Sequence, residues 1–211
     1  MTFQNSSIMD LLKEATAEQH RDAERRKLQK EMVGGRITAD TYRNWLGQML
    51  LLHSALWSAI VARRVSSPPL ADVVRDDGCH VANLRADLMA LDGDPDEIRP
   101  LPATERGLGT IRSAAEEDPL SLLGYNYVLE GSMNGNRYIA RALTHSLKIS
   151  ATSYLDPYGE EQRPIWVAYR ERMNAAGFDA SQAERMVAGA RDMFSTIAEL
   201  SDQLMEEPAK A

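Results

Sequence analysis

The chain has 211 residues, of which 44% are hydrophobic and 26% charged; this composition excludes collagen-like, disordered and membrane-embedded classes and predicts one domain with a substantial core. With 24 lysines and arginines against 31 aspartates and glutamates, the formal net charge of −7 argues against general binding to nucleic acid or to an anionic membrane. The single cysteine, Cys79, excludes an intrachain disulfide. Residues 1–10 lack the pattern of a secretory signal, and the nearly apolar run 49–62 is shorter than a membrane span, so we expect a soluble, cytoplasmic protein.

The first half of the chain predicts three helices. Apolar residues recur at three- and four-residue spacing, and no series of alternating strands is visible, which indicates an all-α fold. We expect one helix over 8–32, closed by Gly34-Gly35. Thr38 caps a second helix that Pro68-Pro69 stops, and a third helix follows over 70–91.

The second half predicts further helices and no domain-dividing linker, so residues 1–211 are expected to form a single domain with its core at about 8–205. The expected elements are a helix from near Thr104, a helix over 120–147 launched by Asp118-Pro119 and weak in the middle, a helix over 160–176, and a last helix to Met205 opened by a capping box of Ser181 and Glu184.

The four histidines are the first candidates for chemistry. His53 lies inside an apolar run and is predicted to be a buried core residue, whereas His80 and His145 have no grouped partners. His20 is flanked one turn either way by small residues, which leaves room for a flat ligand. Lys13 lies seven residues earlier, about 10 Å along the same helical face, and suits a ligand with a metal centre and an anionic edge; a plain surface face is the alternative.

The second candidate is a glycine-rich segment inside the apolar helix predicted over 120–147. Gly131 and Gly135 are four residues apart and share a face, although each glycine costs about 1 kcal/mol of helix propensity relative to alanine. Backbone without side chains allows a ligand to approach closely, and Ser132, Asn134 and Asn136 can hold water beside it. The alternative is a kink or a turn between two helices.

Two basic groups complete the candidates. Tyr169–Asn174 places Arg170 near a helix end, where a cation also interacts favourably with the helix dipole. Arg25, Arg26 and Lys27 lie close to His20 on an otherwise acidic chain, and this basic surface suits an acidic partner protein or is simply solvated.

These segments, in this order, resemble the heme oxygenase family. Leu12-Lys13-Glu14-Ala15-Thr16 followed by His20 resembles the family's opening run, which ends in the histidine that binds heme iron. The segment Gly131–Asn136 is similar to its glycine-rich distal helix, and Tyr169–Asn174 matches its tyrosine-arginine-x-arginine-methionine-asparagine stretch. The resemblance covers about residues 8–205 and implies a single-domain helical fold with heme between an N-terminal proximal helix and a kinked distal helix.

The resemblance also implies roles and a reaction. It places His20 on the iron, Lys13 and Arg170 at the heme propionates, Phe194 on the heme face, and Gly131 with Gly135 over the iron. Family enzymes consume dioxygen and external electrons to open the heme ring, releasing biliverdin, iron and carbon monoxide. By resemblance the electron donor is an acidic ferredoxin or flavin reductase, and the basic surface at Arg25, Arg26 and Lys27 is its expected docking site.

The sequence departs from the family pattern at several positions. Ser132 stands where many members have an aspartate that organises water, Asn136 replaces a glycine, Trp166 replaces a lysine, and Asn126 replaces a tyrosine, although Tyr127 is adjacent. These departures leave the biliverdin isomer open. They also motivate an alternative, a heme sensor or carrier of the same fold that does not degrade heme, while a more distant alternative is another ligand on the same scaffold.

Overall fold

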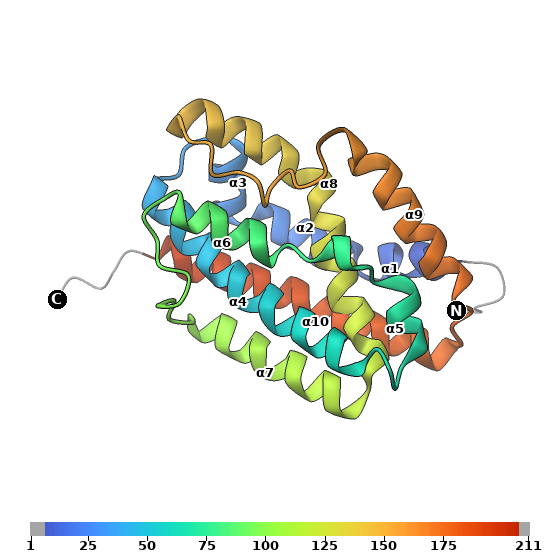
Figure 1. Ribbon diagram of the computed structural model, residues 1–211. Coiled ribbons are helices and arrows are strands. Elements are labelled where there is room, and N and C mark those ends of the chain that lie inside the picture. Colours follow the sequence, from blue (N-terminus) through green and yellow to red (C-terminus); the bar gives the residue numbers. More distant parts are fainter. Residues whose placement is uncertain (1–6, 207–211) are drawn as a thin grey trace.

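The structure is a computed structural model, and it describes residues 7–206. All regular secondary structure in that part of the chain is helical and it contains no strand, which confirms the expected all-α fold (Figure 1). The helices are α1 Ile8–Ala15, α2 Ala17–Arg25, α3 Lys27–Val33, α4 Ala39–Arg63, α5 Pro68–Val73, α6 Val81–Met89, α7 Pro102–Glu117, α8 Leu122–Leu147, α9 Gln162–Ala175 and α10 Ala180–Met205, with short 3-10 turns η1 Asp76–Gly78, η2 Pro119–Ser121 and η3 Gly159–Glu161.

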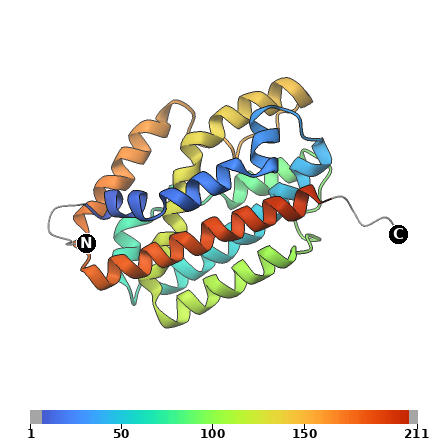
Figure 2. The same ribbon diagram turned by 180° about the vertical axis from the view of Figure 1, so that it is seen from behind.

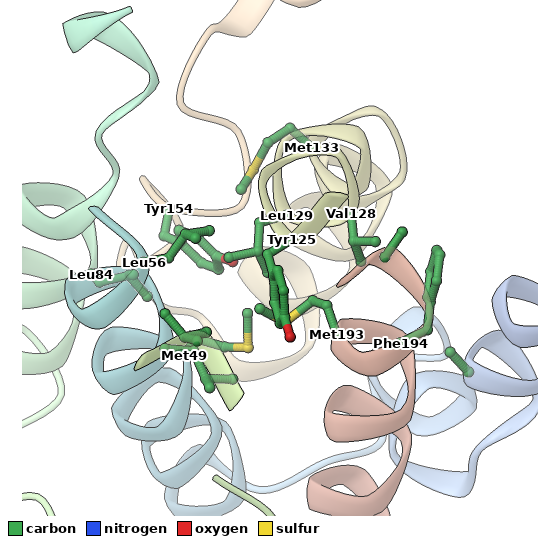
Figure 3. Close-up of a cluster of buried hydrophobic side chains, with 14 of the residues drawn as sticks. Met49, Leu56, Leu84, Tyr125, Val128, Leu129, Met133, Tyr154, Met193 and Phe194 are labelled. Carbon is green, nitrogen blue, oxygen red and sulfur yellow. The ribbon is translucent and has the colours of Figure 1, made fainter. Parts of the chain in front are cut away.

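The crossing of α8 and α10 lies at the centre of the molecule. Two glycines allow the close approach: an added Cβ at Gly124 would overlap the carbonyl oxygen of Met186, and one at Gly189 would lie 2.6 Å from the carbonyl oxygen of Ser121. Helices α4 and α7 pack beside this pair (Figure 1). Figure 3 shows the resulting apolar cluster, with Phe194 at its edge on the side of the N-terminal helices.

Helix α4 is a core helix. Its N-cap is Thr38, whose side chain accepts a hydrogen bond from Thr41 N, as the sequence predicted. By length and hydropathy this helix could also cross a bilayer, contrary to the expectation from the shorter run 49–62, but 56% of its apolar window is buried within the protein. We attribute its apolar character to the core that it forms with α6, α7 and α8.

The predicted first helix over 8–32 is wrong, because the structure divides it into α1, α2 and α3. The breaks fall at Thr16, with φ −112° and ψ 7°, and at Arg26, whose ψ of 147° is extended. Arg191 on α10 stabilises the first break, since its Nε and Nη2 donate to the carbonyl oxygen of Ala15 at 3.1 and 2.9 Å. Gly34 does cap α3, as expected. Figure 2 shows the three short helices lying along α10.

Three other predicted elements also differ. The helix expected over 70–91 consists of α5, η1 and α6, and Pro68 begins α5 rather than simply stopping α4. The capping box of α10 is formed by Asp179 and Gln182 instead of Ser181 and Glu184, because the helix begins one residue earlier. Helix α8 begins at Leu122, after the turn at Pro119, and has no break at its glycines, although Figures 1 and 2 show it changing direction along its length.

Candidate functional site

A cavity of about 550 Å³ lies between the N-terminal helices on one side and α8 on the other. This volume is within the range of about 300–1,000 Å³ that is typical of small-molecule sites. One wall is lined by His20, Ala23 and Glu24 of α2, and the opposite wall by the α8 segment that contains Gly131 and Gly135. The cavity therefore brings together two of the three segments singled out in the sequence.

His20 presents its ring at the proximal wall. The side chain is 56% exposed, and its ring stands edge-on to Phe194 with 5.6 Å between the ring centroids. Nδ1 lies 3.5 Å from Oε2 of Glu24. A carboxylate next to one imidazole nitrogen is the usual arrangement by which a protein orients a metal-ligating histidine. Glu24 was missed in the sequence, although its spacing of four residues from His20 on one helix was a visible signal.

The distal wall is shaped by α8 and by the side chain of Trp166. A Cβ added at Gly135 would have no heavy atom within 4 Å, so this position faces the open cavity. A Cβ at Gly131 would lie 3.3 Å from Cη2 of Trp166, which also lines the cavity and stacks on Tyr169. The aromatic pair supports the helix where its own side chain is missing, and Gly135 leaves room for a flat ligand.

The polar residues of the distal wall are bonded mainly to their own helix. Ser132 Oγ donates to the carbonyl oxygen of Leu129 at 2.7 Å and accepts from Asn136 Nδ2 at 3.3 Å. Asn134 Nδ2 donates to the carbonyl oxygen of Gly131 at 3.0 Å. Ser132, Asn134 and Asn136 all line the cavity, as predicted, but none of them carries a charge. Their bonds along α8 offset the helix-weakening effect of the two glycines.

Tyr127 and Phe194 line the cavity as well. The pKa of Tyr127 is raised by burial, against the opposing effects of a hydrogen bond with Thr16 and of the positive charge of Arg170. The phenol therefore remains neutral and serves as a hydrogen-bonding wall residue. Tyr127 therefore lies near Thr16, at the break between α1 and α2.

Lys13 and Arg170 are exposed and do not line the cavity. Lys13 is on α1 and His20 on α2, so the predicted 10 Å spacing along one continuous helix does not hold. Arg170 Nη2 lies 3.9 Å from Oδ1 of Asp10, and its charge reaches the cavity only through its effect on Tyr127. Contact of either cation with a ligand stays a prediction that requires its side chain to change position.

The basic surface near His20 is smaller than its sequence suggests. Arg25 and Lys27 are exposed, but Arg26 is half-buried at the break between α2 and α3. Its guanidinium pairs with Asp22 at 2.5 Å and with Asp202 at 2.7 Å. Arg26 therefore holds α2 against α10, and only its neighbours present unmatched positive charge.

Of the histidines outside the cavity, His53 lies as predicted, whereas His80 has a partner that the sequence did not indicate. His53 is buried in the core as expected, and its Nε2 lies 2.9 Å from the hydroxyl of Tyr154. Burial, followed by the neighbouring His80, holds the pKa of His53 well below the ordinary value of 6.5. His80 is not isolated, since its Nε2 lies 3.3 Å from Oε2 of Glu130, fifty positions away along the chain. Such a pair has no signal in the local sequence.

The residues present fit a heme group. The cavity offers an imidazole backed by a carboxylate on one wall, aromatic side chains at its edges and an unobstructed glycine on the opposite wall. No three His, Cys, Asp or Glu side chains within residues 7–206 are placed to hold a bare metal ion. A metal carried inside a macrocycle requires only one protein ligand, and the imidazole of His20 on the cavity wall fits that requirement.

Comparison with solved structures shows the fold. Heme oxygenase-1 from the cyanobacterium Synechocystis sp. PCC6803 in complex with heme has a TM-score of 0.87 at 20% identity, covering 95% of this chain and 93% of that chain. Heme oxygenase from Leptospira interrogans also gives 0.87 at 18% identity, covering 94% and 100%. A TenA homologue from P. horikoshii gives 0.66 at 14% identity, covering 94% and 100%, so this fold also occurs outside heme oxygenases.

Sequence comparison gives the family. Curated relatives include heme oxygenase 2 of Mus musculus, 23% identical over 90% of this chain, and heme oxygenase 1 of Homo sapiens, 24% identical over 94%. The chain spans 62% of the length of the mouse relative and 72% of the human one. A family model described as heme oxygenase matches residues 6–203, nearly the whole chain. This chain belongs to the heme oxygenase family.

Proposed function

We propose that the protein is a heme oxygenase that holds heme in the cavity between α2 and α8 and opens its ring oxidatively. The observation that carries the proposal is the pairing of His20 and Glu24 on one wall with the open position at Gly135 on the other. Heme is both substrate and cofactor, and when bound it supplies the iron at which dioxygen and external electrons are used to form biliverdin, iron and carbon monoxide. The family and the fold support this assignment.

The residues of the cavity then have distinct tasks. His20 binds the iron, Glu24 orients its imidazole, and Phe194 packs against the ring. Trp166 and Tyr127 exclude water from the edge of the site. The distal polar residues Ser132, Asn134 and Asn136 bind and orient water with their remaining hydrogen-bonding capacity.

Electron delivery is assigned to an acidic redox partner, a ferredoxin or a flavin reductase, that docks beside His20. Arg25 and Lys27 are exposed there and carry the interaction, whereas Arg26 contributes through its structural pairs. The charge reversals Arg25→Glu and Lys27→Glu together, with the two reversals Arg99→Glu and Arg112→Glu at exposed positions elsewhere as the control of equal net charge, separate docking from net charge. Loss of turnover with the acidic partner but not with a chemical reductant supports the docking site, and equal loss with both contradicts it.

One observation favours a second function, that of a heme carrier or sensor which does not degrade heme. Among residues 7–206, the distal residues that line the cavity are all uncharged, and the only carboxylate on the lining, Glu24, lies on the proximal side. A distal wall without a carboxylate or an imidazole supplies no acidic side chain that donates a proton for reductive chemistry.

The decisive experiment is a hemin titration followed by reductant under air, with absorption spectroscopy and product chromatography. Heme oxygenase activity predicts a Soret band on binding and then conversion to biliverdin with release of iron. A carrier or sensor predicts the Soret band with no loss of heme during many minutes under reductant. Absence of any spectral shift on adding hemin would overturn both functions.

A further inference from the structure

One side of α8 carries buried polar residues that the proposed function leaves unused. Asn126 and Glu130 are four residues apart and therefore share a face of the helix, and they are 8% and 5% exposed. Glu130 directly precedes Gly131 in the distal wall. Burying a carboxylate is costly unless it is paired, and a buried pair contributes little net stability, so its presence here requires a different explanation.

Glu130 is bonded to two side chains from distant parts of the chain. His80 Nε2 lies 3.3 Å from its Oε2, and the hydroxyl of Tyr158 donates to its Oε1 at 2.9 Å. Tyr158 Oη also lies 3.2 Å from His80 Nε2, which closes a triangle of polar groups. The side chains of His80 and Glu130 are 2% and 6% exposed, while Tyr158 is half-buried and reaches toward solvent.

A small cavity of about 10 Å³ adjoins the pair and is lined by His53, His80, Asn126 and Glu130. That size, as space for the centre of a water molecule, matches about one water. Oδ1 of Asn126 is buried and finds no hydrogen-bond partner among residues 7–206. A buried amide oxygen without a partner beside a polar cavity of this size indicates an ordered water.

Helix α9 carries a second set of buried polar atoms, next to the heme cavity. Oε1 of Gln162 and the hydroxyl of Tyr169 are also buried without a partner in the described residues. Nε2 of Gln162 donates to Oδ1 of Asn134 at 3.3 Å, and Asn134 lines the heme cavity. We define these residues as the polar seam: Asn126, Glu130, Asn134, His80, Tyr158 and Gln162.

We propose that the polar seam is filled with ordered water and supplies protons to the heme cavity, with the Glu130–His80 pair as the group that holds the proton. The pair releases one proton through water toward Asn134, and solvent at Tyr158 returns one proton to the pair. No electron moves in this step, and only bonds to hydrogen are broken and formed. This role rests on the proposed function, because it replaces the charged distal group that the lining of the cavity lacks.

The surroundings of Glu130 favour this pair as the proton carrier. Burial, followed by the charge of Glu130, raises the pKa values of Tyr154, Tyr158 and Tyr169, so these phenols remain hydrogen-bond donors. The pKa of His53 is lowered by burial, so its ring remains neutral. The other charged groups that act on the seam are Asp77 from η1 and Arg172 from α9, and both act on Tyr158.

The test compares Glu130→Gln and His80→Gln with the exposed controls Glu161→Gln and His145→Gln. Each protein is loaded with heme and turned over with a chemical reductant under air, in H₂O and in D₂O. We expect Glu130→Gln and His80→Gln to slow ring opening by about 100-fold, the lower end of the range typical of a general acid, and to enlarge the solvent isotope effect. Heme affinity should stay within about twofold of the wild type, because neither residue lines the heme cavity. The controls should match the wild type.

A second measurement uses the heme-free protein. A high-resolution crystal structure is expected to show water bonded to Asn126 Oδ1, and Asn126→Leu should lack it. Wild-type turnover that is unchanged in Glu130→Gln and His80→Gln would overturn the seam while leaving the proposed function intact. A wild type that binds heme without opening it would overturn the proposed function and the proton role together. A dry cavity in the heme-free crystal would overturn the hydrated seam independently of any activity.

Discussion

The two walls of the heme cavity are built in opposite ways. The proximal wall is formed by α2 and α3, short helices of nine and seven residues, and α2, which carries His20, buries only Ala23. The distal wall is part of one 26-residue helix with twelve buried residues. Few apolar contacts and exposed polar ties are typical of a segment of low local stability, whereas a long buried helix is held by the core.

The two walls are therefore held in place by different kinds of interaction. Polar contacts hold α2 at both of its ends, namely Arg26 with Asp202 and Arg191 with the carbonyl oxygen of Ala15, and α2 itself contributes only Ala23 to the core. The distal wall is fixed by packing and sets the shape into which the heme must fit. Heme entry is therefore expected through movement of α2, and the predictions below test each wall separately.

His20→Ala is expected to have the largest effect. Loss of the imidazole removes the protein's ligand to iron, and since changes to groups behind a metal ligand already cost about 10- to 100-fold, turnover should fall by about 100-fold or more. Absorption and electron paramagnetic resonance spectra of the heme complex report the missing nitrogen, and added imidazole should restore part of the activity. Full activity without imidazole would contradict the proximal assignment, and His145→Ala, on the exposed end of α8, is the control.

Gly124→Ala tests the anchoring of the distal wall. The added Cβ would overlap the carbonyl oxygen of Met186, so α8 and α10 would have to separate. We expect a loss of about 3 kcal/mol in the free energy of unfolding, at the upper end for an overpacked core, measured by denaturant titration. Gly109→Ala on α7 has no atom within 4 Å of the added Cβ and should be neutral or stabilising. Equal stabilities of the two variants would refute the close crossing.

His53 predicts a pH dependence of the core behind α8. Because burial lowers its pKa in the folded state, below about pH 6.5 the unfolded chain takes up a proton that the folded protein does not. As the pH is lowered below about 6.5, the free energy of unfolding should therefore decrease, by up to about 1.4 kcal/mol per pH unit from this residue. The free energy of unfolding of His53→Gln should depend less steeply on pH than that of the wild type between about pH 5 and pH 7, the range around the ordinary imidazole pKa of about 6.5. The exposed His145→Gln should keep the wild-type slope, and an unchanged slope in His53→Gln would rule out this source.

Gly135→Ala should separate stability from binding. The new methyl group projects into the cavity without touching protein, so the heme-free protein should gain about 1 kcal/mol from helix propensity. The same methyl group occupies space required by the ligand, and heme affinity should fall. Thermal unfolding and hemin titration measure the two effects, and Gly131→Ala, which meets Trp166, should gain less stability. Unchanged heme affinity in Gly135→Ala would place the ligand elsewhere.

The predicted helical class and most helix ends were correct because they depend on local signals. Thr38 caps α4, Gly34 caps α3, and Gly177, with a φ of 69°, follows α9 as expected. The breaks at Thr16 and Arg26 were missed because neither position has a glycine or a proline. They depend on Arg191 and Asp202, which lie on α10 and reach the N-terminal helices only in the folded chain.

The candidate site was predicted in outline but not in detail. His20, Gly131 and Gly135 do line one cavity. They could be identified beforehand because each of the motifs that contain them is contiguous in sequence. The polar seam could not be predicted, because His80 and Glu130 come together only through the packing of α8 against the loop before α6. The exposed positions of Lys13 and Arg170 likewise depend on the break between α1 and α2 and on the orientation of α9.

The placement of the tryptophans has a practical consequence. Trp45 and Trp166 line the heme cavity, whereas the third tryptophan, Trp57, lies under the guanidinium of Arg64 at 4.9 Å. Indole emission overlaps porphyrin absorption, so Trp45 and Trp166, which line the cavity, should be strongly quenched by a bound heme. Intrinsic fluorescence thus gives an unlabelled measure of heme occupancy, and Trp166→Phe, which keeps Trp45, measures the share of the quenched signal that comes from Trp166.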